Sequence, residues 1–465
     1  MPRPPRSAAP ALPPARRAAL LALDRCLRGQ DIQAALDAAL GAVFTPTGAP
    51  GRQEPSKTAT ADALDAALAT ELAYGTLRRK PSLDFILATL LRDPQALPAA
   101  MHLVLAVAAY EILFLDRIPA YASTHWATEH VKTAINPRLG KVCNAVLRRV
   151  AELGPGGPDD AFFRQPPLAH EKALCPGGAG DEALFLARRF GVPHWLAALW
   201  LEACGPGAAR LLLAATCQAP PLGLRFRPQV PGAAERLASL AAQPCCLAAT
   251  ACGVALASPP PDLADILASG QAVRQSLAGQ AALEALGAAS WPRPVWDACC
   301  GRGGKSLLLA DAAPGTILAS DPNARRLAGL NAERRRLAAT AVAPFRARAE
   351  AFTPRRPLSA ILLDAPCSGL GVLSRRPDTL LRRTPKDVAD LARVQARLLR
   401  HAASCLAPGG LLAYVTCTIS PAENQAQLDA FLAAQPRFRL SATHQTPPES
   451  PLAEFFFAAL LERAD

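Results

Sequence analysis

From about Pro292 onward, apolar segments alternate with Gly-rich turns and with segments of helical periodicity. The apolar segments predict strands at residues 294–300, 316–321, 343–349, 359–366 and 409–417. The segments between them predict helices at residues 306–313, 324–338, 385–407 and 423–435. This alternation is typical of a mostly parallel, doubly wound (Rossmann-like) α/β sheet. Such sheets bind ligands at the carboxyl ends of their strands, so the residues at these ends are the candidates for a site.

The first 150 residues follow a helical pattern instead. Between Ala15 and Val150, several segments place apolar residues at i, i+3, i+4 and i+7, and turn-forming residues separate them. This predicts an all-α bundle. We expect five parts: a basic Pro-rich tail (1–14), the helical domain (15–150), a linker (151–182), a small α+β module (183–262) and the α/β domain (263–465). In the small module, residues 220–228 predict a half-buried strand with Arg225 and Arg227 on a basic outer face.

The charge balance indicates a polyanionic partner. Lys and Arg total 50 against 38 Asp and Glu, which gives a net charge of +12 at pH 7. Nucleic acid is the first candidate for such a partner and an anionic membrane the second. No segment has the roughly 18 uninterrupted apolar residues of a membrane span, so we expect a soluble protein and no membrane partner.

The 13 cysteines are interpreted as thiols in a reducing compartment. The first residues lack the basic-then-apolar layout of a secretory signal, so we expect a cytoplasmic protein. No Cys-x-x-Cys or His-x-x-x-His spacing occurs, and adjacent pairs such as Cys299/Cys300 suit a tetrahedral zinc site poorly. We therefore expect no metal.

A glycine-rich turn follows the first predicted strand, in the sequence D-A-C-C-G-R-G-G-K-S from Asp297 to Ser306. Its three glycines allow a ligand to approach the backbone closely, and the helix that follows presents its polar N-terminus. A P-loop needs four residues between its first Gly and Gly-Lys-Ser, but only two separate Gly301 from Gly304. Plain turn chemistry remains the alternative to ligand binding.

Asp321 ends the next predicted strand, about twenty residues after the glycines, where an acid can bind both hydroxyls of a ribose. This placement favours a nucleoside-bearing cofactor. The alternative is that Asp321 caps the N-terminus of the helix predicted at residues 324–338.

Two cysteines follow two later strands. Cys367 stands in D-A-P-C-S-G-L-G (364–371) and Cys417 in Y-V-T-C-T-I-S (414–420). Because the carboxyl ends of parallel strands share one edge of a sheet, both thiols should face the same crevice. A single cysteine is often only a small buried hydrophobe, but two of them beside Asp364 indicate reactive thiols.

These motifs, in order and spacing, resemble the signature motifs of the Sun-type RNA cytosine-5 methyltransferases, which use S-adenosylmethionine. The segments G-T-L-R-R-K-P-S-L-D and K-V-C-N-A-V-L-R-R-V within residues 15–150 are similar to the NusB-like RNA-binding domain of the bacterial RsmB subgroup. The resemblance implies methylation of carbon 5 of a cytidine in ribosomal RNA of the small subunit. It also implies an RNA partner. Nothing in the sequence demands a dimer, so we expect a monomer.

The resemblance also implies roles for individual residues. Cys417 would be the nucleophile that adds to carbon 6 of cytosine, since carbon 5 becomes nucleophilic only after such an addition. Cys367 would assist elimination of the product, and Asp364 would hydrogen-bond the cytosine. The implied cofactor-binding residues are Cys299, Cys300, Gly301, Arg302, Gly303, Gly304, Lys305, Asp321, Glu350 and Asp364.

The chain departs from the family pattern at several positions. Cys300, Gly301 and Arg302 replace Ala, Ala and Pro of the family's usual C-A-A-P-G-G-K-T, while the two following glycines and Lys305 remain. The usual acid after the third strand is replaced by Arg348, with Glu350 two residues on. Ser276 stands where the family has an acid before the first motif. The alternative function is a non-catalytic RNA-binding or assembly factor with a degenerate cofactor motif.

Overall fold

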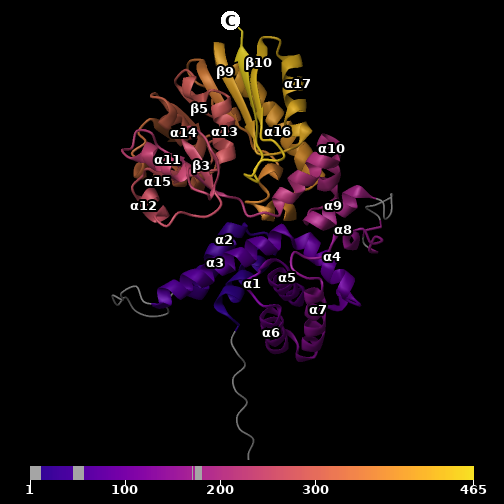
Figure 1. The fold of residues 1–465 in the computed structure, drawn as a ribbon. Coiled ribbons are helices and arrows are strands. Elements are labelled where there is room, and N and C mark those ends of the chain that lie inside the picture. Colours follow the sequence, from indigo (N-terminus) through magenta and orange to yellow (C-terminus); the bar gives the residue numbers. More distant parts are fainter. Residues whose placement is uncertain (1–11, 45–56, 170, 173–180, 465) are drawn as a thin grey trace, which may run out of the picture. The chain divides into compact units, whose positions relative to one another are not determined.

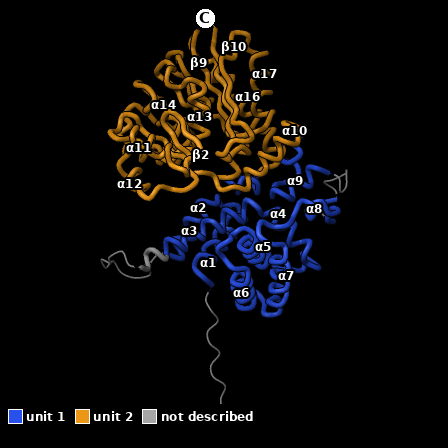
Figure 2. The backbone as a smooth tube through the Cα atoms, viewed as in Figure 1, with its two compact units in different colours: residues 1–201, 376–382 blue, residues 202–375, 383–465 orange. Residues whose placement is uncertain are grey.

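The computed structural model describes residues 12–44, 57–169, 171–172 and 181–464. These form two compact units: unit 1 comprises residues 1–201 and 376–382, and unit 2 comprises residues 202–375 and 383–465 (Figure 2). Most of the predicted basic tail, residues 45–56 and part of the predicted linker lie outside the described residues.

Unit 1 is entirely helical within its described part, which confirms the predicted all-α domain. Its helices are α1 (Pro14–Leu27), α2 (Ile32–Phe44), α3 (Lys57–Arg78), α4 (Lys80–Leu90), α5 (Ala99–Phe114), α6 (Ala120–His130), α7 (Gly140–Glu152), α8 (Asp160–Phe163) and α9 (Glu182–Phe190) (Figure 1). Helix α5 is apolar almost all round and is buried along most of its length. A helix with no polar face is stable only when other helices surround it, so α5 forms the centre of this unit.

One carboxylate lies inside this apolar centre. Glu111 of α5 is fully buried and accepts hydrogen bonds from Arg16 Nε at 2.9 Å, Ser123 Oγ at 2.6 Å and Trp126 Nε1 at 2.8 Å. A buried charge is tolerated when it is paired and hydrogen-bonded. Glu111 therefore joins α1, α5 and α6 through one side chain.

A short segment distant in sequence also belongs to unit 1. Residues 376–382 group with it, although the chain on either side of them belongs to unit 2 (Figure 2). Arg376 Nη1 lies 3.7 Å from Asp31 Oδ2, and Asp378 is ion-paired with Arg382 inside the same segment.

Helix α10 (His194–Thr216) contains the boundary between the units. Its length and a mean hydropathy of 1.3 would suffice to cross a membrane. However, Gly205 has a non-helical backbone, with φ of 75° and ψ of 169°, and Pro206 follows it. A membrane span needs about 20 continuous helical residues, and neither half of the kinked helix has them.

The larger sheet of unit 2 confirms the predicted Rossmann-like domain. It comprises β5 (Val295–Asp297), β6 (Ile317–Ser320), β7 (Val342–Phe345), β8 (Leu358–Asp364), β9 (Leu406–Thr416), β10 (Phe438–Gln445) and β11 (Phe457–Arg463). The strand order is β10-β11-β9-β8-β5-β6-β7. The pairs from β9 to β7 are parallel, whereas β11 is antiparallel to both of its neighbours, so the sheet is mixed.

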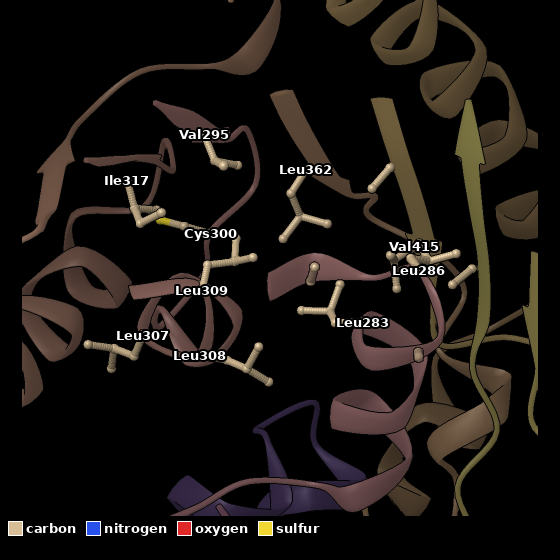
Figure 3. Close-up of a cluster of buried hydrophobic side chains, with 14 of the residues drawn as sticks. Leu283, Leu286, Val295, Cys300, Leu307, Leu308, Leu309, Ile317, Leu362 and Val415 are labelled. Carbon is tan, nitrogen blue, oxygen red and sulfur yellow. The ribbon is translucent and has the colours of Figure 1, made fainter. Parts of the chain in front are cut away.

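Helices cover both faces of this sheet. They are α13 (Leu277–Ala285), α14 (Gly304–Ala312), α15 (Ala324–Arg336), α16 (Pro385–Ser404) and α17 (Gln425–Ala434) (Figure 1). Val295 and Leu362 point to the face packed against α13 and α14 (Figure 3). Trp296 and Leu363 point to the opposite face, which packs against α16 and α17. Apolar residues fill both faces because a parallel sheet is covered on both sides.

A second, antiparallel sheet precedes it. Its strands are β2 (Cys246–Ala249), β3 (Gly253–Leu256), β1 (Leu222–Phe226) and β4 (Ala272–Arg274), in that spatial order, with α11 (Ala233–Ala241) and α12 (Leu263–Ala268). The strand predicted at residues 220–228 is therefore present. The last strand, β4, lies beyond residue 262, the expected end of the small module.

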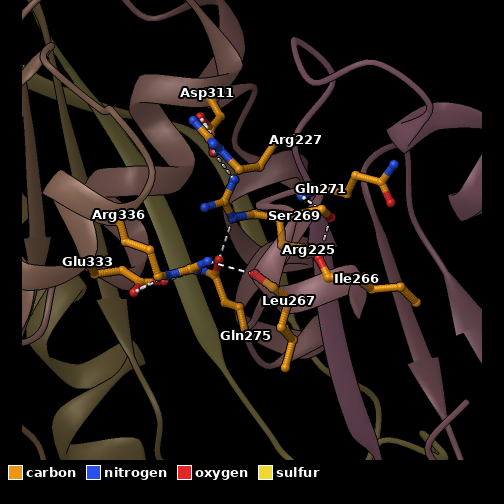
Figure 4. A network of polar contacts seen from close by, with 10 residues as sticks. All are labelled: Arg225, Arg227, Ile266, Leu267, Ser269, Gln271, Gln275, Asp311, Glu333 and Arg336. Atoms are coloured by element: carbon orange, nitrogen blue, oxygen red, sulfur yellow. Dashed lines mark hydrogen bonds and ion pairs between the residues drawn. The ribbon is translucent and has the colours of Figure 1, made fainter. Parts of the chain in front are cut away.

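The predicted basic outer face of β1 is wrong. Arg225 and Arg227 are 1% and 7% exposed, and both are paired with Asp311 of α14 (Figure 4). Gln275 also accepts a hydrogen bond from Arg225 Nε at 2.7 Å. The alternating pattern identified the side of the strand on which the arginines lie, but it could not show that a carboxylate more than 80 residues away covers that side. These arginines are structural and do not form a surface for RNA.

Candidate active site

The two predicted cysteines meet at one edge of the large sheet. Strands β8 and β9 are neighbours, with Asp364 opposite Val415, so the loops after them begin side by side. Cys367 Sγ and Cys417 Sγ lie 3.3 Å apart, and the Cys417 N–H donates to Cys367 Sγ at 3.4 Å. The two thiols thus lie next to each other at the edge of the sheet where the parallel strands β8 and β9 end.

The pKa values of the two thiols are shifted in opposite directions. The hydrogen bond with Cys367 lowers the pKa of the Cys417 thiol, and Lys305 contributes in the same direction against the effects of burial and of Asp364. The same hydrogen bond, followed by burial, raises the pKa of Cys367. A thiolate at Cys417 can thus accept a hydrogen bond from a neutral thiol at Cys367. The thiolate is the nucleophilic form of cysteine.

Lys305 is paired with the acid at the end of β8, and its charge acts on the Cys417 thiol. Its Nζ is 2.8 Å from Asp364 Oδ2 and 5.3 Å from the centre of the Phe456 ring. Burial acts to lower the pKa of Lys305, but the ion pair with Asp364 outweighs it, so the pKa is raised. The side chain of Asp364 is still 30% exposed, which leaves it open to a ligand.

The glycine-rich turn joins β5 to α14 in a conformation that needs glycine. Gly303 has φ of +81°, and a Cβ there would lie 2.1 Å from Leu330 Cδ1. Gly301 has φ of +57°, but no atom of the described residues lies within 4 Å of the position that its Cβ would take. The turn is therefore packed against α15 at Gly303 and open at Gly301. Helix α14 begins at Gly304, directly after this opening.

Asp297, at the end of β5, is fully buried beneath the turn. Its Oδ2 accepts a hydrogen bond from Ser306 Oγ at 2.6 Å, whereas Oδ1 has no hydrogen-bond partner among the described residues. Burial raises the pKa of Asp297 to about 7, although the bond from Ser306 opposes this shift. A buried polar atom without a partner is costly, and a bound ligand is one way to satisfy it.

Asp321 holds the glycine turn and does not cap a helix. Its Oδ2 accepts from the Gly301 N–H at 3.1 Å and its Oδ1 from the Asn323 N–H at 2.7 Å, while Arg326 Nη1 lies 3.5 Å from Oδ2. The cap of α15 is Asn323, whose side chain accepts from two backbone N–H groups of the first turn. The alternative interpretation of Asp321 as the helix N-cap is therefore wrong.

The remaining predicted cofactor residues differ in how deeply their side chains are buried. The Cys300 thiol is buried in the apolar cluster under the sheet, so only its backbone can contact a ligand at the turn (Figure 3). Cys299 is half-buried, and burial raises the pKa of both thiols. Arg302 and Glu350 are exposed; Glu350 lies in a short 3-10 turn after β7.

A carboxylate that the sequence did not indicate, that of Glu454, lies beside Ser276. Ser276 Oγ donates to Glu454 Oε2 at 2.6 Å, and Arg375 Nε donates to Glu454 Oε1 at 2.6 Å. The side chain of Glu454 is 3% exposed. Position 276 lacks the family's acid, and Glu454, which precedes β11, places a carboxylate next to it. No local pattern signals this contact because it joins residues 178 positions apart.

The sheet, the glycine turn and the helical unit define a Rossmann-like methyltransferase domain preceded by a NusB-like domain. The family described as 16S rRNA methyltransferase RsmB/F matches residues 290–454. The NusB family matches residues 13–152. Together these matches contain the glycine turn, both cysteine motifs and the helices α1 to α7.

Relatives match across nearly the whole chain. The ribosomal RNA small subunit methyltransferase B of Pseudomonas putida is 32% identical over 86% of this chain and 88% of its own. That of Xanthomonas campestris is 31% identical over 94% of each chain. The chain therefore belongs to the RsmB/F family of 16S rRNA methyltransferases. The crystal structure of PH0851 shares the fold, with a TM-score of 0.69 at 20% identity over 98% of this chain and 100% of the other.

Proposed function

We propose that this protein methylates carbon 5 of a cytidine in small-subunit ribosomal RNA, with S-adenosylmethionine as the methyl donor. The observation that carries the proposal is the pair of thiols at 3.3 Å, one with a lowered and one with a raised pKa. Cytosine carbon 5 requires covalent activation, and a thiolate with a neighbouring thiol is a chemically suitable device for it. The names of the relatives support ribosomal RNA of the small subunit as the substrate.

The residues around the glycine turn fit a nucleoside-bearing cofactor. The backbone is open at Gly301, the carboxylate of Asp321 lies against it, and Asp297 Oδ1 lacks a partner in the part of the chain that the structure describes. Gly301, Gly303 and Gly304 would admit the methionine part, and Asp321 would hold the ribose hydroxyls. When bound, S-adenosylmethionine supplies an electrophilic methyl group on a sulfonium.

The chain's own residues would carry out the remaining chemistry. The Cys417 thiolate forms a bond to carbon 6 of the cytosine, which moves the electrons of the 5,6 double bond toward carbon 5. Asp364 would hydrogen-bond the amide edge of the base and support protonation at the ring nitrogen, with Lys305 holding that carboxylate in place. After methylation, the carbon 5 proton passes to water, its bonding electrons re-form the 5,6 double bond, and Cys417 Sγ leaves as a thiolate. Cys367 would assist this elimination.

A cytidine in folded RNA must leave its helix to reach the thiols. We propose that the helical domain of unit 1 binds neighbouring RNA, that the protein acts in the cytoplasm and that it acts as a monomer. The net charge of +12 supports an RNA partner, since cations that neutralise phosphates supply much of the affinity for RNA.

Unmodified small-subunit RNA, incubated with the protein and methyl-labelled S-adenosylmethionine, tests the proposal. We expect label in 5-methylcytidine after nuclease digestion; label absent from cytidine refutes it. Calorimetric titration with S-adenosylmethionine separates the proposal from a non-catalytic RNA-binding factor, because such a factor with a degenerate motif binds no cofactor.

A further inference from the structure

Glu423 is a fully buried carboxylate directly behind the two cysteine loops. It accepts hydrogen bonds from the Ser368 N–H at 2.8 Å, Ser368 Oγ at 2.5 Å and Gln395 Nε2 at 2.9 Å, and Thr418 Oγ1 lies 3.5 Å away. None of these contacts is an ion pair. An ionised carboxylate without a cation is tolerated in such a place when several donors surround it.

The partners of Glu423 belong to both cysteine loops. Ser368 directly follows Cys367, and Thr418 directly follows Cys417. The two hydroxyls are also 2.8 Å apart, so they and the carboxylate form one connected cluster. Gln395 of α16 donates to the Pro366 carbonyl at 2.9 Å as well as to Glu423. Glu423 thus lies at the point where the two loops are joined.

The backbone of Glu423 is held in place too. Its carbonyl accepts from Tyr414 OH at 2.7 Å, and Tyr414 is buried in β9, the strand that ends just before Cys417. Asn424, the next residue, accepts from Thr416 Oγ1 at 2.6 Å and donates to the Thr418 carbonyl at 2.9 Å. The carboxylate is therefore anchored to the strand that positions Cys417, and from there it holds the Cys367 loop.

We propose that Glu423 is a positioning residue for the methylation reaction: its carboxylate ties Ser368 to Thr418 and so sets the spacing of Cys367 and Cys417. The expected effect on kcat rests on the proposed function, whereas the expected effect on the two thiols does not.

The charge of Glu423 acts on the thiols together with that of their other neighbours. The groups whose charge or hydrogen bond acts on the thiols are Asp364 at the end of β8, Lys305 of α14, Glu423 after β9 and the partner thiol itself. After the mutual hydrogen bond and burial, the negative charge of Glu423 contributes to a higher pKa for Cys367, and it opposes the lowering at Cys417. At Cys367 the loss of this charge and any weakening of the mutual hydrogen bond act in the same direction, so removing the charge should lower the pH at which the Cys367 thiol ionises.

The test compares Glu423→Gln with Ser368→Ala and with a control, Glu462→Gln. Glu423→Gln removes the negative charge and places an amide N–H donor beside groups that are themselves donors. Ser368→Ala keeps the charge of Glu423 and removes one hydrogen bond to it. Glu462 lies on β11, where it accepts from the exposed Arg439 at 2.8 Å. In full-length protein, the pH dependence of Cys417 and Cys367 alkylation by iodoacetamide is followed by mass spectrometry. With ribosomal RNA as the methyl acceptor, kcat and the KM for S-adenosylmethionine are measured.

For Glu423→Gln we expect the alkylation midpoint of Cys367 to move down by about half a pH unit or more. We also expect kcat to fall about tenfold or more with the KM for S-adenosylmethionine unchanged within about twofold, because the interaction acts on the reacting groups. Ser368→Ala should lower kcat without the change in midpoint, and Glu462→Gln should match the wild type in both measurements.

The inference is overturned if Glu423→Gln and Ser368→Ala both keep the alkylation midpoints and the kcat of the wild type. If Glu423→Gln does not fold, Ser368→Ala decides: an unchanged kcat then counts against the positioning role. If the wild-type protein methylates no cytidine, the proposed function fails, and the alkylation midpoints still decide whether Glu423 controls the thiols.

Discussion

Cys367 and Cys417 are 50 residues apart in the sequence, yet their sulfur atoms lie 3.3 Å from each other. The parallel pairing of β8 and β9 brings them together, because both cysteines follow the carboxyl ends of adjacent strands. Their mutual hydrogen bond raises the pKa of one thiol and lowers that of the other. One thiol can therefore act as nucleophile while the other remains protonated.

Replacing each of the two cysteines should cause a different catalytic defect. Cys417→Ala should abolish methylation, since no bond to carbon 6 can form. Cys367→Ala should still form that bond but should eliminate the product slowly, so a protein–RNA adduct should accumulate. Denaturing gels with labelled RNA measure the adduct. An adduct with Cys417→Ala and none with Cys367→Ala would reverse the proposed roles.

Lys305→Met should shift the pH dependence of activity upward. After the hydrogen bond from Cys367, the positive charge of Lys305 helps to lower the pKa of Cys417, so its loss should raise that pKa. The acidic limb of the kcat/KM profile should then move to higher pH, by about one unit. An unchanged limb would mean that the thiolate does not depend on this cation. Lys386, which is exposed on α16, offers the matched Lys→Met control.

Asp297 should make the stability of the protein depend on pH. Burial raises its pKa in the folded state to about 7, well above that of an exposed aspartate. Between about pH 4 and 7 the folded state then holds a proton that the unfolded state has lost, so stability falls as the pH rises. Asp297→Asn should remove this contribution, which amounts to a few kcal/mol at roughly 1.4 kcal/mol per pKa unit.

Urea unfolding of the wild type and of Asp297→Asn at pH 5, 6 and 7 measures this effect. The stability of the wild type relative to the variant should decrease steadily across the series. A constant difference would show that Asp297 does not titrate in this range.

Asp311→Ala should destabilise unit 2 strongly. It leaves Arg225 and Arg227 buried without their carboxylate, and breaking such a buried pair costs about 3–5 kcal/mol. Urea unfolding measures the loss. Asp390→Ala is the control: Asp390 also pairs with two cations, Lys386 and Arg393, but at the surface, and its loss should change the unfolding midpoint little. Similar midpoints for both variants would contradict the buried role of Asp311.

Much of the fold and part of the site follow from local patterns in the sequence. Helical periodicity is a property of neighbouring residues, so it predicted the all-α domain. The alternation of strands and helices predicted the parallel sheet, and the rule that parallel strands end at one edge predicted that Cys367 and Cys417 would meet. The glycines after β5 and the acid after β6 were found in the same way.

Contacts between distant segments could be decided only by the tertiary structure. An alternating strand cannot reveal that Asp311 covers Arg225 and Arg227, nor can a capping preference choose Asn323 over Asp321. Ser276 lacks an acid in sequence but gains Glu454 in space, and Glu423 becomes important because Ser368 reaches it from another loop. The physical reason is that burial, pairing and pKa depend on the groups that folding brings within a few ångströms, whereas periodicity and motif spacing record only the local chain.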